Sequence, residues 1–128
     1  MSGATIRSID VELPERVVTN AELDAAHPGW RMADVRRRTG VESRRWCRAD
    51  ETALDLAERA CRRLLARAIV PPEQIDAVLF CTQTPDFVMP PNACLLQARL
   101  GLPRTVAALD FSLACSGFVY GLYLSKAM

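Results

Sequence analysis

The chain has 128 residues, which is the length of one domain and enough to bury a sizeable core. Half of the residues are hydrophobic and 24% are charged, and 16 Lys and Arg against 15 Asp and Glu leave a net charge of +1. This balance supplies no field that would recruit nucleic acid or an anionic membrane. No apolar run approaches the roughly 20 residues of a membrane span, and the N-terminus lacks the pattern of a signal peptide. We therefore expect a soluble, cytoplasmic protein.

The cysteines and the histidine limit the chemistry that the chain can carry. Five cysteines are present: Cys47, Cys61, Cys81, Cys94 and Cys115. Their odd number, their long gaps and the absence of a C-x-x-C pair argue against a disulfide framework and against a zinc site. A metal site or a self-contained Cys–His pair would rest on the single histidine, His27. We expect neither.

The first third of the chain predicts a strand followed by short helices. Residues 4–12 place Ile6, Ile9 and Val11 among polar neighbours, which predicts a half-buried strand that ends at Pro14. Asn20 is a suitable N-cap for a helix over residues 21–26, before Pro28-Gly29.

An arginine-rich segment comes next, flanked by Trp30 and Trp46. Met32 and Val35 lie on one face of a short helix that Gly40 can close. The arginines of the segment are Arg31, Arg36, Arg37, Arg38, Arg44, Arg45 and Arg48. Two interpretations stay open: a solvated cationic surface with tryptophans packed beneath it, or a phosphate site with a tryptophan on which a flat ring stacks. RNA binding is disfavoured by the neutral net charge and by the lack of a nucleic-acid motif.

Residues 52–69 give the clearest helix, with Thr52 as its cap and Pro71-Pro72 as its end. The predicted apolar stripe consists of Ala53, Leu56, Ala57, Ala60, Cys61, Leu64, Leu65 and Ala68. Acid-before-base pairs at i,i+4, Asp55/Arg59 and Glu58/Arg62, indicate that the opposite face is solvated.

Residues 75–82 form an apolar run typical of a strand covered on both faces, with Cys81 as a core residue. A loop with Pro85, Pro90 and Pro91 follows and carries three apolar side chains, Phe87, Val88 and Met89. These side chains are either packed under the loop or offered to a partner or ligand. Asn92 is a candidate cap for a helix through residue 100 that Gly101 closes, and residues 106–109 predict the next strand.

Cys115 follows that strand and precedes a helical segment over residues 118–124. A thiol at the start of a helix lies near free N–H groups, which favour the nucleophilic thiolate. The alternative is that Cys115 is a buried residue that behaves as a small hydrophobe. The predicted order is strand, helices, strand, long helix, strand, helix, strand, helix, which indicates an α/β fold with a largely parallel sheet.

Four stretches resemble the N-terminal portion of the β-ketoacyl-(acyl carrier protein) synthase III family, of the thiolase superfamily. They are residues 13–20 (LPERVVTN), 38–44 (RTGVESR), 82–93 with the proline loop, and 110–118, whose Ala-Cys-Ser-Gly-Phe is similar to the family's nucleophile motif. The resemblance implies that residues 1–128 are the N-terminal half of a thiolase-like layered domain.

The resemblance also implies an acyltransferase reaction. Cys115 would be acylated by an acyl-CoA, and a malonyl group on acyl carrier protein would lose CO₂ and attack the thioester. The N–H of Cys115 would contribute to the oxyanion hole. Arg38 matches an arginine at the CoA entrance, Trp30 a tryptophan that stacks on adenine, and Met89 a side chain that enters the acyl pocket across a homodimer. The expected reaction uses these two substrates and no cofactor.

Family members are more than twice as long, and their catalytic histidine and asparagine lie in the second half. Residues 120–128 read as a helix without a stop signal, so we expect the chain to be the N-terminal part of a longer condensing enzyme. The alternatives are a half-length, non-catalytic acyl- or CoA-binding module or partner subunit, and a different acyltransferase on the same fold.

Overall fold

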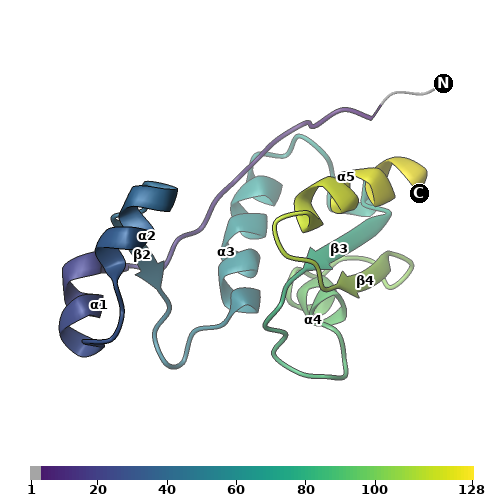
Figure 1. Cartoon of the computed structure of the whole chain (residues 1–128). Coiled ribbons are helices and arrows are strands. Elements are labelled where there is room, and N and C mark those ends of the chain that lie inside the picture. The colour runs from purple at the N-terminus through teal and green to yellow at the C-terminus, as the bar shows by residue number, and fades with distance from the viewer. Residues whose placement is uncertain (1–3) are drawn as a thin grey trace. The chain divides into compact units, whose positions relative to one another are not determined.

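The structure is a computed structural model that describes residues 4–128. The chain divides into two compact units (Figure 1). One unit comprises residues 13–51, and the other joins the N-terminal segment up to Glu12 to residues 52–128. Within the described residues, no helix is long and apolar enough to cross a membrane.

The unit of residues 13–51 is a two-stranded ribbon with two helices. Its elements are β1 (Arg16–Thr19), α1 (Asn20–Ala26), α2 (Met32–Thr39) and β2 (Ser43–Trp46). The strands pair antiparallel from Arg16 opposite Trp46 to Thr19 opposite Ser43. Val18, Leu23 and Met32 are buried together and form the core of this unit.

The ends of the helices in this unit confirm one expectation and correct another. Gly40 ends α2 with a φ of 73°, as its position predicts. The cap of α1 is Thr19 rather than Asn20, because Thr19 and Glu22 form a reciprocal capping box. The Asn20 side chain instead donates to the Val41 carbonyl at 2.9 Å and accepts from Arg44 at 2.6 Å.

The predicted strand over residues 4–12 is wrong. This segment has no strand structure, and Ile6, Ile9 and Val11 are exposed. It is held by side chains instead of a strand partner: three arginines spaced four residues apart, Arg59, Arg63 and Arg67, bind its carboxylates and carbonyls. Such spacing aligns the three guanidinium groups along one face of a helix.

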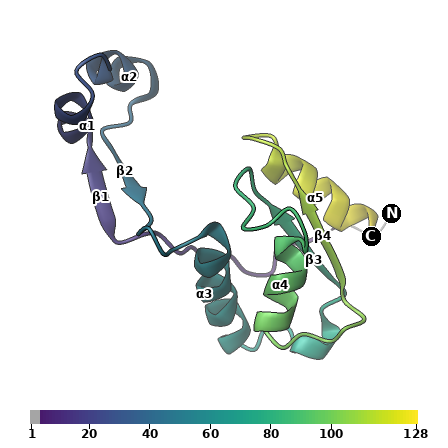
Figure 2. The same ribbon diagram turned by 90° about the horizontal axis from the view of Figure 1, so that it is seen from below.

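The larger unit is built on two parallel strands. Its elements are α3 (Ala53–Ala66), a 3₁₀ turn η1 (Pro72–Gln74), β3 (Ala77–Cys81), α4 (Asn92–Arg99), β4 (Ala107–Phe111) and α5 (Gly117–Ala127). The strands pair in register from Ala77 opposite Ala107 to Cys81 opposite Phe111, which confirms the predicted parallel pairing. Figures 1 and 2 show α4 on one face of this pair and α5 on the other.

Alternation along the strands divides their side chains between the two faces. Phe80 packs on the α3–α4 side, where Leu54, Ala93 and Leu96 complete the buried cluster. Leu54 is fully buried although it lies outside the predicted stripe. Ala57 and Cys61 pack against the same cluster. The face of α3 that contacts the core therefore begins at Leu54 and not at Ala53, the first residue of the predicted stripe.

The close packing of α5 against β3 requires a glycine at the start of the helix. A Cβ built on Gly117 would lie 2.3 Å from the Cys81 Sγ, so this glycine lets the helix approach the strand. The Cys81 thiol also donates to the Leu113 carbonyl at 3.4 Å. Cys81 is exposed on this face, and the expectation that it is a core residue is therefore wrong.

We predict that Gly117→Ala lowers the free energy of unfolding by about 1–3 kcal/mol, the usual cost of overpacking. Adding Cys81→Ala removes the clashing Sγ, and its Cβ lies 3.8 Å from the added methyl group. The double variant should therefore recover most of the loss in a denaturant titration. Gly29→Ala is the control, because a Cβ there meets no atom within 4 Å. An additive loss in the double variant would contradict this packing.

The ion pairs of the N-terminal segment predict a pH dependence. A hydrogen bond from Arg63 holds the pKa of the Asp10 carboxyl below its ordinary value of 3.8. Because the pKa is lowered in the folded state, the contact stabilises the fold above about pH 4, and this stability is lost as the pH falls through the lowered pKa. An NMR titration should find the pKa of Asp10 returned toward 3.8 in Arg63→Gln. Arg62→Gln, which removes a pair with Glu58, should leave it low; equal values in both variants would refute the assignment.

Candidate functional site

Cys115 lies in the turn between β4 and α5. It directly precedes Ser116, the N-cap of α5, and no side chain caps this helix. The thiol is exposed, which favours the interpretation of a reactive residue over that of a buried one. Within residues 4–128 the N–H of Cys115 makes no hydrogen bond. By contrast, burial raises the pKa of the Cys61 thiol and disfavours its thiolate.

The proline loop presents its apolar side chains to solvent. Val88 is 98% exposed and Met89 is 77% exposed, and Phe87 is exposed as well. Packing beneath the loop is therefore excluded for Val88 and Met89, and these side chains are available to a partner or ligand. A cavity of about 350 Å³ at the carboxyl ends of β3 and β4 is lined by Phe87 and Val88 together with Thr82, Pro85, Pro91, Asp110, Phe111 and Ser112.

A carboxylate from β4 holds the start of α4. Asp110 accepts hydrogen bonds from the N–H groups of Asn92 and Ala93, each at 2.7 Å. These are two of the helix N–H groups that lack a partner within the helix, and the positive end of the helix dipole favours the negative charge. Asn92 is thus the first residue of α4, with Pro91 as N-cap, and the prediction that Asn92 caps the helix is wrong.

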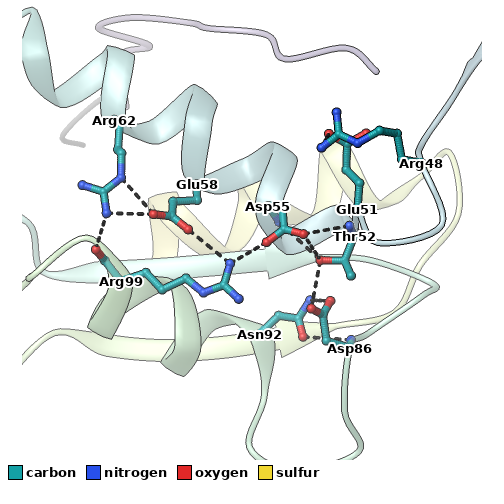
Figure 3. Close-up of polar contacts among 9 residues, drawn as sticks. All are labelled: Arg48, Glu51, Thr52, Asp55, Glu58, Arg62, Asp86, Asn92 and Arg99. Atoms are coloured by element: carbon teal, nitrogen blue, oxygen red, sulfur yellow. Dashed lines mark hydrogen bonds and ion pairs between the residues drawn. The ribbon is translucent and has the colours of Figure 1, made fainter. Parts of the chain in front are cut away.

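The side chain of Asn92 takes part in a polar network instead (Figure 3). Its amide nitrogen donates to the Asp86 carboxylate at 3.1 Å, and its amide oxygen accepts from the Asp86 N–H at 3.1 Å. The Thr52 hydroxyl donates to the other oxygen of Asp86 at 2.9 Å. Thr52 caps α3 as predicted, in a capping box with Asp55.

Arg99 extends this network between α3 and α4. It binds Asp55 at 2.7 Å and Glu58 at 3.1 Å. The hydrogen bond from Arg99, followed by that from the Thr52 N–H, lowers the pKa of Asp55. For Glu58 the hydrogen bond from Arg62 lowers the pKa most, and Arg99 adds to it. The predicted pair of Glu58 with Arg62 is confirmed, at 2.7 Å.

The other two predicted site residues, Trp30 and Arg38, belong to the unit of residues 13–51. Trp30 is 52% exposed, and its ring stacks on the His27 ring with centroids 4.3 Å apart. Arg38, near the end of α2, is exposed and makes no hydrogen bond or ion pair within residues 4–128. Its neighbours Arg36 and Arg37 are paired with Glu42 and Asp34.

The polar contacts around β4, the strand that precedes Cys115, were not predicted from the sequence. Asp110 interrupts an apolar strand, and Asn92 follows two prolines at a helix start. A charged residue in an apolar strand needs a polar partner. The charge of Asp110 could therefore have marked it as a residue with such a partner. Nothing in the sequence indicates that Asp86 is the partner of Asn92. Within the described residues, no group of three or more His, Cys, Asp or Glu side chains is arranged to hold a metal ion.

Comparison with known proteins identifies the fold and the family, although no family model matches the chain. The β-ketoacyl-[acyl-carrier-protein] synthase III of Alkalilimnicola ehrlichii is 46% identical over an alignment of 127 positions, which covers 95% of this chain and 38% of that protein. A crystal structure of a 3-oxoacyl-(acyl-carrier-protein) synthase III matches 95% of this chain and 36% of its own, with a TM-score of 0.84 and 47% identity. The synthase III structure from Thermus thermophilus matches 97% of this chain and 38% of its own, with a TM-score of 0.84 and 37% identity.

These matches define an α/β protein of the thiolase-like fold. The chain belongs to the β-ketoacyl-[acyl-carrier-protein] synthase III family and corresponds to its N-terminal portion. It spans about 38% of the length of the curated relatives that it matches.

Proposed function

We propose that this chain supplies the acyl-accepting nucleophile, Cys115, of a β-ketoacyl-acyl carrier protein synthase III. The observation that carries the proposal is the exposed thiol at the turn from β4 into α5, within a chain of this family. The substrates are an acyl-CoA primer and malonyl-acyl carrier protein, and the reaction needs no further cofactor.

The first step transfers the acyl group to the protein. The Cys115 thiolate attacks the thioester carbonyl of the acyl-CoA, the new S–C bond forms, and the CoA thiolate leaves and takes up a proton. The N–H of Cys115, which makes no hydrogen bond within residues 4–128, donates to the oxyanion that develops on the carbonyl oxygen. The covalent thioester divides one difficult condensation into two easier steps.

The second step forms a carbon–carbon bond. The malonyl group loses CO₂, and the electron pair left on its α-carbon attacks the acyl carbonyl while the Cys115 thiolate leaves. Members of this family supply the histidine and asparagine for this step from their second half. The products are a β-ketoacyl-acyl carrier protein and CO₂, and the proposed location of the reaction is the cytoplasm.

Three further residues bind the substrate in this proposal. Arg38 pairs with a CoA phosphate, a role supported by its exposed guanidinium, which has no partner within the described residues. Trp30 stacks on the adenine ring with its free face, opposite His27. Met89 enters the acyl pocket of a second copy in a homodimer, supported by its exposure on the proline loop.

Incubation of the protein with acetyl-CoA should add the mass of one acetyl group to the peptide that contains Cys115. Cys115→Ala should abolish the adduct, because it removes the thiol that lies in the turn into α5. Cys47→Ala, which removes an exposed cysteine in the other unit, is the matched control and should leave it unchanged. An adduct that persists in Cys115→Ala, or that never forms on the folded protein, would refute the nucleophile and favour a non-catalytic acyl- or CoA-binding role.

The role of Arg38 has its own test with a neighbouring control. Arg38→Ala should weaken CoA binding, measured by calorimetry, by about tenfold, because a charge-assisted hydrogen bond to phosphate contributes roughly 1.5–3 kcal/mol. Arg37→Ala removes an equal charge from the same helix, but Arg37 is already paired with Asp34 at 2.9 Å. Equal losses in the two variants would indicate a general charge effect rather than a phosphate contact.

A further inference from the structure

Asn92 is fully buried, with 0% of its surface exposed. A buried carboxamide is costly unless both its donor and its acceptor are used. Asp86 satisfies both: the amide nitrogen of Asn92 donates to the Asp86 carboxylate, and its oxygen accepts from the Asp86 N–H. The two contacts close the chain on itself between residues 86 and 92.

The closed segment carries the exposed apolar side chains. Phe87, Val88 and Met89 lie between the two bonded residues, and all three side chains are exposed. The position of these side chains therefore depends on how the ends of the segment are fixed. Asp86 is fixed once more, through its second carboxylate oxygen, by the Thr52 hydroxyl at the start of α3.

The same asparagine is tied to the strand that leads to Cys115. Its backbone N–H donates to Asp110 at 2.7 Å, and the Ala93 N–H donates to the other oxygen of that carboxylate. Asp110 lies on β4, five residues before Cys115. Asn92 thus holds the loop with its side chain and is held by the nucleophile's strand through its backbone.

We infer that Asn92 is a positioning residue that latches the loop of residues 86–92 to the strand of Cys115 and so sets the acyl-chain selectivity of the site. The inference rests on the proposed function, because selectivity has meaning only if Cys115 accepts acyl groups. Met89, between the two ends of the latch, contacts the acyl chain in the second copy of the proposed homodimer, whereas Asn92 acts only through the position of this side chain.

The chemistry of the latch explains why its residue is an asparagine. A carboxamide offers the donor to the Asp86 carboxylate and the acceptor to the Asp86 N–H on two separate atoms. An aspartate at this position would keep the acceptor but would place a second carboxylate against Asp86. An alanine would leave both groups of Asp86 without this partner.

The test compares Asn92→Ala with Gln97→Met, a variant on the same helix. Gln97 donates to the Pro103 carbonyl at 2.7 Å, away from the loop, so this variant removes an amide of α4 without touching the latch. Two quantities are measured on the full protein: hydrogen exchange of the Asp86 amide, and the ratio of Cys115 acylation by acetyl-CoA to that by octanoyl-CoA in a mixture of the two.

Asn92→Ala should accelerate exchange of the Asp86 amide about tenfold and change the acylation ratio about fivefold, the effect of losing one or two hydrogen bonds. Gln97→Met should lower the melting temperature and leave both quantities unchanged. A ratio that stays constant in Asn92→Ala, or that changes equally in both variants, would overturn the inference. Absence of any Cys115 adduct in the unaltered protein would instead refute the proposed function, and unchanged Asp86 exchange in Asn92→Ala would still overturn the latch.

Discussion

The parallel pairing of β3 with β4 is the constraint on which the candidate site depends. Parallel strands that pair in register end at the same edge of the sheet, here with Cys81 opposite Phe111. The loop that follows β3 and the turn that follows β4 therefore leave the sheet side by side. The first carries Met89 and the second carries Cys115. A long crossover is required between such strands, and α4 supplies it.

Asp110 is a charged residue in an otherwise apolar strand, and its position on β4 compensates the charge. Its register position places it opposite Phe80, on the side of the sheet that faces α4. There the carboxylate meets two helix N–H groups rather than hydrocarbon, so its charge is compensated by hydrogen bonds and by the helix dipole. One side chain thereby joins the helix start, the strand and, through Asn92, the proline loop.

The sequence predicted those features that depend on local patterns. The start of α3 with its cap at Thr52, the αL end of α2 at Gly40 and the alternation that leads to a parallel pair all follow from spacing and residue type. The predicted strand before Cys115 and the helical segment after it indicated a thiol at the start of a helix, and the structure places Cys115 there. The roles of Cys115, Trp30, Arg38 and Met89 in binding and catalysis stay predictions.

The predictions that were wrong concern segments whose structure depends on contacts with residues distant in the sequence. Residues 4–12 alternate like a strand, but arginines of α3 hold the segment through its carboxylates and carbonyls. Asparagine is a common N-cap residue, which is why Asn92 was predicted to cap α4. Instead Asp110, eighteen residues later, supplies the carboxylate oxygen atoms that accept from the first N–H groups of the helix. Neither partner can be identified from periodicity, because periodicity reports which face is apolar and not which charged group lies opposite.

The most direct test of this account is a crystal structure of the protein after reaction with an acyl-CoA. The account predicts electron density that is continuous from the Cys115 Sγ into an acyl group, with the carbonyl oxygen within hydrogen-bond distance of the Cys115 N–H. An acyl group attached to another cysteine, or intact acyl-CoA bound with no bond to Cys115, would contradict it.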